Sequence, residues 1–382
     1  MTYVVGGLEL ERPYRIERLG HFGYHTPDLS GTIRFLTEDL GLLLSDVDDF
    51  TKRVPELPKE HATGYFVRCA HDHHTLVIGS QMLVDIREPA RKGALVNQLS
   101  WQIGSLQQVI DGVTYLEENA KIRRIGRDSP GSNWHAYAYC PDGYVNEIYY
   151  GMEQIGWDGR SKPSSMYDRA FHSLPPLPQI SEHQEVDEAL AREGELIGYR
   201  YDDKPEGAYV VDGVLLAQPF KLTRLARVCL FVENPEESLA FYRDVLGLSV
   251  TSRSEVAGQP AIFLRAASEH HSLALLSNTV KEQFGIGAAC SFTVASYEQL
   301  KAAYDYLSKR GVEILDLPAE LSPGLPYGFW VKGPDAVAIQ IVYGTERFDA
   351  DATTPQPMAT LPATIRHGGA NWYEPPFLGP LG

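Results

Sequence analysis

Apolar residues follow two spacings along the first 80 residues, and the two spacings succeed each other in a fixed order. The segments RLGHFGYHT (18–26), YFVRCA (65–70) and HTLVIG (74–79) have the composition of strands. Between the first two, the stretch from Ser30 to Leu40 carries apolar residues at helical spacing and ends at Gly41. The pattern predicts a strand, a helix and then further strands.

The same order recurs over the next 70 residues or so. NQLSWQIGS (97–105) is predicted to be a strand and LQQVIDGVTYLEENA (106–120) a helix. HAYAYC (135–140) and VNEIYYG (145–151) then form a closing pair of strands. Each stretch therefore corresponds to a βαβββ module, and two modules fill the first 150 residues.

The chain then repeats itself at an offset of about 206 residues. Two copies of one unit determine the architecture more firmly than any local pattern does. We therefore expect an α+β protein with four βαβββ modules in two tandem domains. Four pairs of segments carry the repeat: VVGGLELERPYRIERLGH (4–21) and VVDGVLLAQPFKLTRLAR (210–227), DLSGTIRFLTEDLGL (28–42) and NPEESLAFYRDVLGL (234–248), HHTLVI (73–78) and HHSLAL (270–275), and PDGYVNEIYYG (141–151) and PDAVAIQIVYG (334–344).

Polar residues that suggest chemistry are concentrated in the first copy. Three of them change in the second copy: His21 becomes Arg227, Gln98 becomes Ala289 and Glu147 becomes Gln340. The second copy keeps its hydrophobic pattern, so we expect it to support the first domain or to form a subunit interface. A secondary hypothesis is that Arg227 pairs with an interior carboxylate or a ligand anion.

The repeat and the composition together predict four parts. Residues 1–160 form the N-terminal domain, 161–209 a connector with a short helix at 185–195, and 210–347 the C-terminal domain. The stretch 348–382 is rich in Pro, Ala and Gly, which is typical of a tail that lies as an arm on its own or a neighbouring subunit, or that is partly disordered.

The net charge of the chain excludes some classes of binding partner. A net charge of −16 and a pI near 5.2 argue against nucleic acid or an anionic membrane, because both bind basic surfaces. The four cysteines show no CxxC spacing, and no leader segment or long apolar stretch is present. We expect a cytoplasmic homo-oligomer that acts on a small molecule.

These motifs resemble the vicinal oxygen chelate superfamily, and most of all its type I extradiol ring-cleaving dioxygenases. The likeness lies in the LGH that opens a strand, the PDL…F…DLGL helix, the HHTL strand and the PDG…NE-IYYG close, over about 1–160 and 210–345. The resemblance implies that each pair of modules curls into an open barrel. It also implies one divalent metal, held in the dioxygenases by two His and one Glu.

Carried onto this chain, the resemblance assigns roles to single residues. His21 and Glu147 are the expected metal ligands, and Gln98 stands where the second ligand His is expected. His74 falls on the acid/base position and Tyr137 on the position that contacts the substrate oxygen. Asp128 replaces a further active-site His, for which His135 is a partial substitute, and a turn-forming role for Asp128 remains open.

The residues leave three functions open. In the first, Fe(II) or Mn(II) on His21, Gln98 and Glu147 accepts a catechol and O2, with His74 as acid/base. In the second, His74 is a fourth ligand, as in relatives that resemble glyoxalase I, and Ni(II), Co(II), Mn(II) or Zn(II) supports an isomerase, lyase or epimerase reaction. In the third, the barrel is a metal-free binding or resistance protein whose cavity is lined by aromatic residues.

The other histidines of the first copy are less prominent. His61, His71 and His73 are predicted to be solvated loop residues. His74 itself has a counterpart, His271, in a copy without a site, so a role in turn geometry remains open for it.

Overall fold

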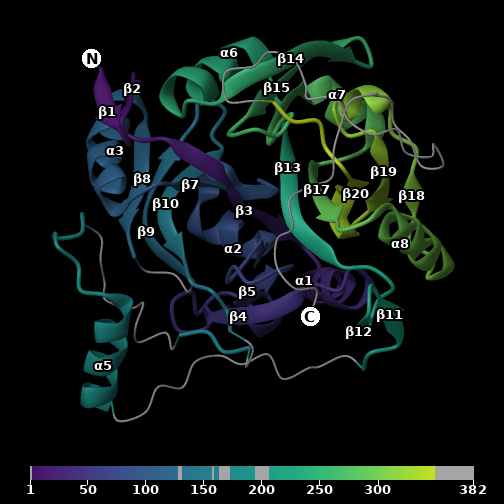
Figure 1. Ribbon diagram of the computed structural model, residues 1–382, viewed down its shortest axis with the longest axis horizontal. Coiled ribbons are helices and arrows are strands. Elements are labelled where there is room, and N and C mark those ends of the chain that lie inside the picture. The colour runs from purple at the N-terminus through teal and green to yellow at the C-terminus, as the bar shows by residue number, and fades with distance from the viewer. Residues whose placement is uncertain (1, 128–130, 157–158, 163–172, 194–205, 349–382) are drawn as a thin grey trace.

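The computed structural model describes residues 2–127, 131–156, 159–162, 173–193 and 206–348 of the chain. Within them the chain forms two eight-stranded mixed sheets and two small hairpins (Figure 1). The predicted α+β class and the repeated βαβββ modules are confirmed, and neither sheet is closed, as expected for open barrels. No helix among the described residues is long and apolar enough to cross a membrane.

The N-terminal sheet has the strand order β4-β5-β6-β3-β7-β10-β9-β8. Its first module consists of β3 (Ile16–Thr26), α1 (Leu29–Arg34) with the π-helical turn η1 (Phe35–Asp39), β4 (Leu43–Asp49), β5 (Thr63–Arg68) and β6 (Leu76–Ser80). Its second module consists of β7 (Val96–Ile103), α3 (Leu106–Asn119), β8 (Lys121–Gly126), β9 (Ser132–Tyr139) and β10 (Val145–Met152). The short helix α2 (Gln81–Arg87) connects the two modules.

The C-terminal sheet repeats this order as β14-β15-β16-β13-β17-β20-β19-β18. Its first module consists of β13 (Leu222–Val232), α6 (Pro235–Ala240) with η4 (Phe241–Val245), β14 (Ser249–Val256), β15 (Gln259–Arg265) and β16 (Leu273–Ser277). After α7 (Asn278–Phe284), the second module consists of β17 (Ala288–Val294), α8 (Tyr297–Lys309), β18 (Ile314–Leu315), β19 (Tyr327–Lys332) and β20 (Val337–Tyr343).

A two-stranded hairpin precedes each sheet and packs on a helix of the same copy. The hairpin of β1 (Tyr3–Val5) and β2 (Leu8–Leu10) places Tyr3 edge-on against Tyr115 of α3. The hairpin of β11 (Tyr209–Val211) and β12 (Val214–Leu216) places Tyr209 edge-on against Tyr306 of α8. The repeat therefore extends to these short segments.

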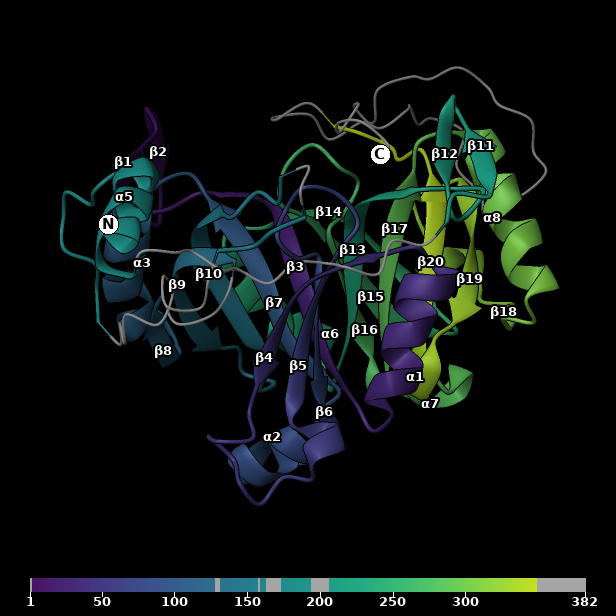
Figure 2. The same cartoon turned by 90° about the horizontal axis from the view of Figure 1, so that it is seen from below.

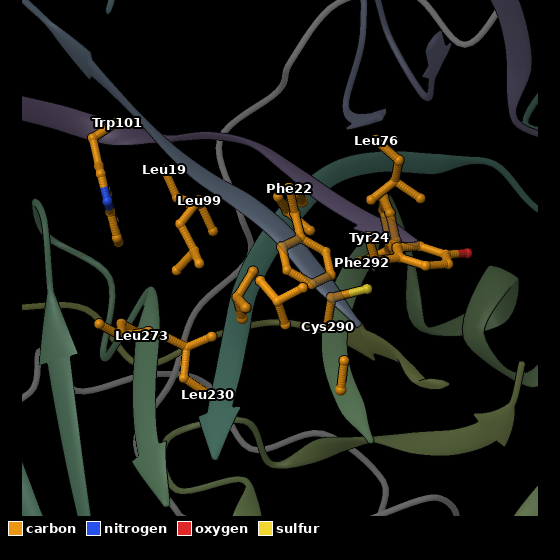
Figure 3. Close-up of a cluster of buried hydrophobic side chains, with 14 of the residues drawn as sticks. Leu19, Phe22, Tyr24, Leu76, Leu99, Trp101, Leu230, Leu273, Cys290 and Phe292 are labelled. Carbon is orange, nitrogen blue, oxygen red and sulfur yellow. The ribbon is translucent and has the colours of Figure 1, made fainter. Parts of the chain in front are cut away.

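One continuous cluster of buried apolar side chains joins the two sheets (Figure 3). Phe22 and Leu99 of the N-terminal sheet and Leu230, Leu273 and Cys290 of the C-terminal sheet belong to it. Burial of apolar surface is the main source of stability, so the two copies depend on each other for their cores. The expectation that the second domain supports the first agrees with this packing.

The first helix of each copy also lies against the other copy. Figure 2 shows α1 beside the C-terminal sheet. Asp39, at the end of η1, forms an ion pair with Arg310 at 2.5 Å. In the opposite direction, Ser238 of α6 donates to Asp142 at 2.6 Å, and Tyr14 donates to the carbonyl of Val245 at 2.7 Å. These reciprocal contacts fix the relative position of the two barrels.

The connector contains one helix, α5 (Glu182–Glu193), close to the predicted range of 185–195. Its Glu185 accepts two hydrogen bonds from the guanidinium of Arg127, at 2.5 and 2.8 Å, and both side chains are buried. This paired contact anchors the connector beside β8. The predicted domain limits remain predictions, and nearly all of the arm at 348–382 lies outside the described residues.

The insides of the two barrels differ. In the N-terminal sheet, β3 and β6 place His25 opposite Gly79, and both residues border a cavity. In the C-terminal sheet the corresponding pair is Phe231 and Leu276, which belong to a buried apolar cluster together with Trp330. Larger apolar side chains therefore fill space in the second copy that remains open in the first.

Candidate metal centre

Three polar side chains from neighbouring strands meet inside the N-terminal barrel. His21 lies on β3, Gln98 on β7 and Glu147 on β10, and β7 lies between the other two strands in the sheet. The strand register places Ser100 of β7 directly beside both His21 and Glu147. The structure therefore brings together the three residues predicted as metal ligands, although ligation itself remains a prediction.

The polar ends of these side chains are almost equally spaced. His21 Nε2 lies 2.9 Å from Glu147 Oε2 and 3.0 Å from the Gln98 amide nitrogen, which in turn lies 3.1 Å from Glu147 Oε2. Ligands about 2.1 Å from a metal are about 3.0 Å apart on an octahedral face, but about 3.4 Å apart on a tetrahedral one. The spacing therefore matches one face of an octahedron.

Hydrogen bonds alone do not satisfy these groups. If His21 Nε2 carries a proton for Glu147, it has no lone pair left for the Gln98 amide. Among the described residues, His21 Nδ1 and Glu147 Oε1 have no hydrogen-bond partner although both atoms are buried. A half-turn of the Gln98 amide would bring its oxygen, a donor acceptable to a hard divalent ion, to the position of the nitrogen.

The set of donors is unusual for a metal site. Among the described residues no group of three or more His, Cys, Asp or Glu side chains is arranged to hold a metal ion, and the third predicted donor here is an amide. With His21 and Glu147 as the other two donors, the set still carries a single negative charge. The residues fit a divalent metal that accepts oxygen and imidazole donors.

Glu147 is ionised although it is fully buried. Burial raises its pKa, but the imidazoles of His21 and His135 and the hydroxyl of Ser100 outweigh this and lower the pKa to about 2. The Ser100 hydroxyl donates to Glu147 Oε2 at 2.5 Å, and His135 Nδ1 lies 3.6 Å from Oε1. A buried carboxylate is stable only with such partners or with a metal.

Sequence reasoning did not identify Ser100 as part of the site. A serine in an apolar strand carries no signal of its own, but the second copy has Ser291 at the same position, and Ser291 contacts Gln340 at 2.9 Å. The recurrence of this serine beside the counterpart of Glu147 was the available clue.

Gly20 allows His21 and Tyr149 to approach each other. A Cβ atom at Gly20 would lie 2.0 Å from the Tyr149 hydroxyl oxygen, so any other residue would displace the tyrosine. The Tyr149 ring lies 5.3 Å from the His21 ring and helps to hold it in place. The LGH motif therefore has a packing reason for its glycine.

His74 lies beside the three predicted ligands. Its ring is 4.2 Å from that of His21, centre to centre, and it borders the same cavity. Burial, reinforced by the nearby His21 and His73, keeps the pKa of His74 well below its usual value, so the ring is neutral at pH 7. A neutral imidazole is either a base or a metal ligand.

The prediction that His73 is a solvated loop residue is wrong. His73 is fully buried, and its Nδ1 lies 3.0 Å from His74 Nδ1 while its Nε2 lies 3.4 Å from Asp46 Oδ2. Asp46 in turn accepts from Ser161 at 2.9 Å. The polar turn at 71–73 suggested exposure, but His73 lies inside the fold against Asp46 and Gly131.

The two remaining candidates have different outcomes. Tyr137 is buried beside Glu147 on β9 and borders the cavity, so it lines the barrel, and a contact with substrate stays a prediction. Asp128 lies outside the described residues.

A cavity of about 530 Å³ opens beside His21, His74 and Gln98. One part of its wall is apolar, with Phe66, Val77, Ile78 and Leu83. The rest carries four arginines and two carboxylates: Arg53, Arg87, Arg123, Arg124, Asp48 and Glu88. Asp48 pairs with Arg53, and Glu88 pairs with Arg123, so the charged lining has an excess of positive charge in an otherwise acidic protein.

In the second copy, the guanidinium of Arg227 occupies the space between the counterparts of the site residues. It is fully buried and contacts five neutral acceptors: Ser291 Oγ at 2.9 Å, His271 Nε2 at 2.6 Å, the Leu321 carbonyl at 2.7 Å, Ser322 Oγ at 2.9 Å and Gln340 Oε1 at 2.5 Å.

The hypothesis that Arg227 pairs with an interior carboxylate is wrong within the described part of the chain, where no carboxylate forms an ion pair with it. His271, Ser291 and Gln340 correspond to His74, Ser100 and Glu147. The second copy therefore holds a buried side-chain cation beside the counterparts of His74, Ser100 and Glu147.

Sequence comparison gives one match to a known family and two matches to dioxygenases. Residues 224–341 match the profile of the Glyoxalase/Bleomycin resistance protein/Dioxygenase superfamily. Among characterised proteins, a biphenyl-2,3-diol 1,2-dioxygenase of Paraburkholderia xenovorans (strain LB400) is 30% identical over 144 residues, which are 37% of this chain and 42% of the relative. A 2,2',3-trihydroxybiphenyl dioxygenase of Sphingomonas paucimobilis is 22% identical over 120 residues, 31% of this chain and 41% of the relative. The matches thus span about two fifths of each relative.

Solved structures share the fold over nearly the whole chain. A halotolerant catechol dioxygenase is 14% identical with a TM-score of 0.55, over 95% of this chain and 98% of its own. An Mn(II)-bound glyoxalase from Novosphingobium aromaticivorans is 14% identical with a TM-score of 0.56, over 95% of this chain and 93% of its own. At this identity the likeness concerns the fold alone, which hosts both chemistries.

Proposed function

We propose that the N-terminal barrel is an extradiol-type dioxygenase that cleaves a catechol-like aromatic with O2, in a chain whose residues 224–341 match the profile of the Glyoxalase/Bleomycin resistance protein/Dioxygenase superfamily. The two curated relatives described above carry dioxygenase names, which favours this reaction over the others known for the fold. The metal is Fe(II) or Mn(II), held by His21, Gln98 and Glu147. The second barrel supports the first and binds no metal.

The observation that carries the proposal is the spacing of the three ligand atoms, at 2.9, 3.0 and 3.1 Å. His21, Gln98 and Glu147 would hold a divalent metal, and the cavity adjoins His21 and Gln98, so a substrate in the cavity would reach that metal. A divalent metal bound there supplies Lewis-acid binding for two vicinal oxygens and, as Fe(II) or Mn(II), the chemistry with O2.

The residues of the cavity then have separate tasks. Phe66, Val77 and Ile78 exclude water and pack on the aromatic ring of the substrate. The neutral His74 accepts a phenolic proton from the substrate and later returns it to the ring-opened product. Tyr137, beside Glu147, donates a hydrogen bond to a substrate oxygen.

The positively charged part of the wall favours a substrate with an anionic substituent. Of the charged residues that line the cavity, arginines outnumber carboxylates four to two. A cleft with an excess of one charge concentrates ligands of the opposite charge. We therefore expect a catechol that carries a carboxylate to bind better than its uncharged analogue.

A second candidate function is supported by the contact between Arg227 and His271. His271 is the counterpart of His74, and it touches the side-chain cation of the second copy at 2.6 Å. If His74 makes the same contact with a metal, the site has four protein ligands and two open positions, which suits a glyoxalase-type isomerase, lyase or epimerase without O2.

The test is ring cleavage by protein loaded anaerobically with Fe(II) or Mn(II), with the metal content measured in the same sample. On addition of O2 and a panel of neutral and carboxylated catechols, we expect a coloured ring-fission product. Glu147→Gln keeps the size of the side chain but removes its charge, and it should abolish both metal binding and turnover.

Two other results would contradict the dioxygenase proposal. If metal-loaded protein cleaves none of the catechols but exchanges a substrate proton for deuterium without O2, the second candidate is correct. If the protein binds an aromatic compound tightly while it is free of metal and takes none up, it is a binding or resistance protein.

A further inference from the structure

We infer that His73 and Asp46 are positioning residues that fix one tautomer of His74, the form in which Nδ1 carries the proton and Nε2 is unprotonated. The inference concerns the protonation pattern of a buried chain of side chains. Only its consequence for turnover rests on the proposed function.

The series of hydrogen-bonded side chains runs from the connector into the site. Asp46 Oδ2 lies 2.9 Å from Ser161 Oγ and 3.4 Å from His73 Nε2, and His73 Nδ1 lies 3.0 Å from His74 Nδ1. Asp46, His73 and His74 are all buried. Burial limits the competition of solvent for these hydrogen bonds.

The donor and acceptor properties of these side chains determine which atom carries the proton in each hydrogen bond. An ionised carboxylate only accepts, so Asp46 requires the proton of His73 on Nε2. A neutral imidazole has one N–H, so His73 Nδ1 must then be an acceptor. The bond between the two Nδ1 atoms requires one proton, and that proton must belong to His74. His74 Nε2 is therefore left with a lone pair.

The second copy provides an independent check of these proton positions. There Arg227 contacts His271 Nε2 at 2.6 Å, and a guanidinium only donates, so that nitrogen must be an acceptor. His271 must then carry its proton on Nδ1, which lies 2.9 Å from Nδ1 of His270. His270 Nε2 points towards a carboxylate oxygen of Glu346 at 3.8 Å. In the second copy, the same placement of the protons thus follows from the Arg227 end of the hydrogen-bonded series.

Both copies also pack the outer histidine against a glycine. A Cβ atom at Gly131 would lie 2.1 Å from His73 Cγ, and one at Gly324 would lie 2.3 Å from His270 Cγ. Both glycines have positive φ, at 82° and 69°, so another residue at either position would be strained as well as crowded. The repeat therefore maintains the arrangement of the two histidines, and not only their presence in the sequence.

The function of the chain follows from the lone pair on His74. An acid/base group must begin as an acceptor to take a proton from the substrate, and the opposite tautomer would present an N–H instead. The same lone pair serves metal ligation, so the inference holds for either candidate function. His73 acts only through His74.

The first test is ¹⁵N NMR of histidine-labelled, metal-free protein. The Nδ1 and Nε2 shifts of a neutral imidazole differ strongly between the protonated and the unprotonated nitrogen. We expect His74 and His271 to show the same pattern, protonated at Nδ1 and unprotonated at Nε2. A protonated Nε2 on His74 in the wild type would overturn the inference, whether or not the protein has any activity.

The second test uses variants. His73→Leu removes the acceptor for His74, whereas His73→Asn keeps a carbonyl oxygen where Nδ1 lies. We expect His73→Leu to lower kcat about 100-fold with KM changed less than about threefold, and His73→Asn to recover most of the loss. The NMR signal of His74 should become a mixture of tautomers in the leucine variant only.

The matched control is His270→Leu, which makes the same change in the copy without a site. It should destabilise the protein about as much as His73→Leu does and leave kcat unchanged. Equal kcat for His73→Leu and the wild type would overturn the positioning role. If His73→Leu does not fold, His73→Asn is measured alone. Loss of the Nδ1 proton of His74 in that variant would also overturn the positioning role.

Discussion

The Glu147→Gln variant provides a quantitative test of the site in the absence of metal. In the wild type, burial is outweighed by His21, His135 and Ser100, and the pKa of Glu147 is lowered from 4.5 to about 2. At about 1.36 kcal/mol per pKa unit, the ionised carboxylate contributes about 3 kcal/mol to the free energy of unfolding above pH 4.5. The amide of the variant would retain a hydrogen bond from Ser100 but would carry no charge.

The sign of the pH dependence follows from the lowered pKa. The stabilisation is complete above the unfolded pKa of 4.5 and is lost as the pH falls through the folded pKa of about 2. At pH 3, which lies between the two pKa values, only part of this stabilisation remains. The difference between wild type and Glu147→Gln should therefore shrink from about 3 kcal/mol at pH 7 to about half of that at pH 3.

The assay is urea-induced unfolding with a metal chelator present, at pH 7, 5 and 3. A control of opposite sign is Glu346→Gln, because burial raises the pKa of Glu346 and its ionised form is disfavoured in the folded protein. That variant should match or exceed the wild type at pH 7. A difference between wild type and Glu147→Gln that stays constant from pH 7 to pH 3 would refute the reasoning.

Three further variants test the centre and its cavity. Gln98→His supplies the imidazole that relatives are expected to have at this position. It should raise the affinity for Fe(II) about tenfold or more, measured by competition with a chelator. An unchanged affinity would mean that residue 98 is not a metal ligand. Gly79→Leu introduces the side chain that Leu276 has at the corresponding position of the C-terminal barrel. We expect it to lower kcat/KM at least about tenfold without changing the metal content. An unchanged kcat/KM would mean that the substrate does not bind in this cavity. Arg87→Ala should raise KM several-fold for a carboxylated catechol but not for catechol, and equal changes for both would exclude an anionic subsite there.

The repeat allowed much of the fold to be predicted. Hydrophobic spacing gave the helix at 106–120, observed as α3 (Leu106–Asn119), and the two copies gave the βαβββ order of both sheets. Local patterns give no information on how the copies pack. The reciprocal contacts of η1 and α6 with the opposite copy depend on tertiary structure that no single segment encodes.

The candidate site was predicted less completely. His21, Gln98 and Glu147 could be found because the second copy lacks all three, so the comparison of the copies singled them out. His73 was missed because a histidine in a polar turn is usually exposed, and its burial depends on Asp46, 27 positions away.

The partners of Arg227 escaped prediction for a related reason. A buried guanidinium usually pairs with a carboxylate, yet here hydroxyl, amide, imidazole and carbonyl groups from four segments surround it. Such neutral acceptors have no signature in the sequence. The oligomeric state, the location and the substrate also remain predictions.

The central claim is that the N-terminal barrel alone binds one divalent metal. Its most direct test is the metal content of anaerobically prepared wild type beside His74→Ala, measured by mass spectrometry. We expect about one Fe or Mn per chain in both, with His74 outside the coordination shell. Metal that disappears in His74→Ala would support the four-ligand alternative, and wild-type protein that takes up no metal would contradict the claim.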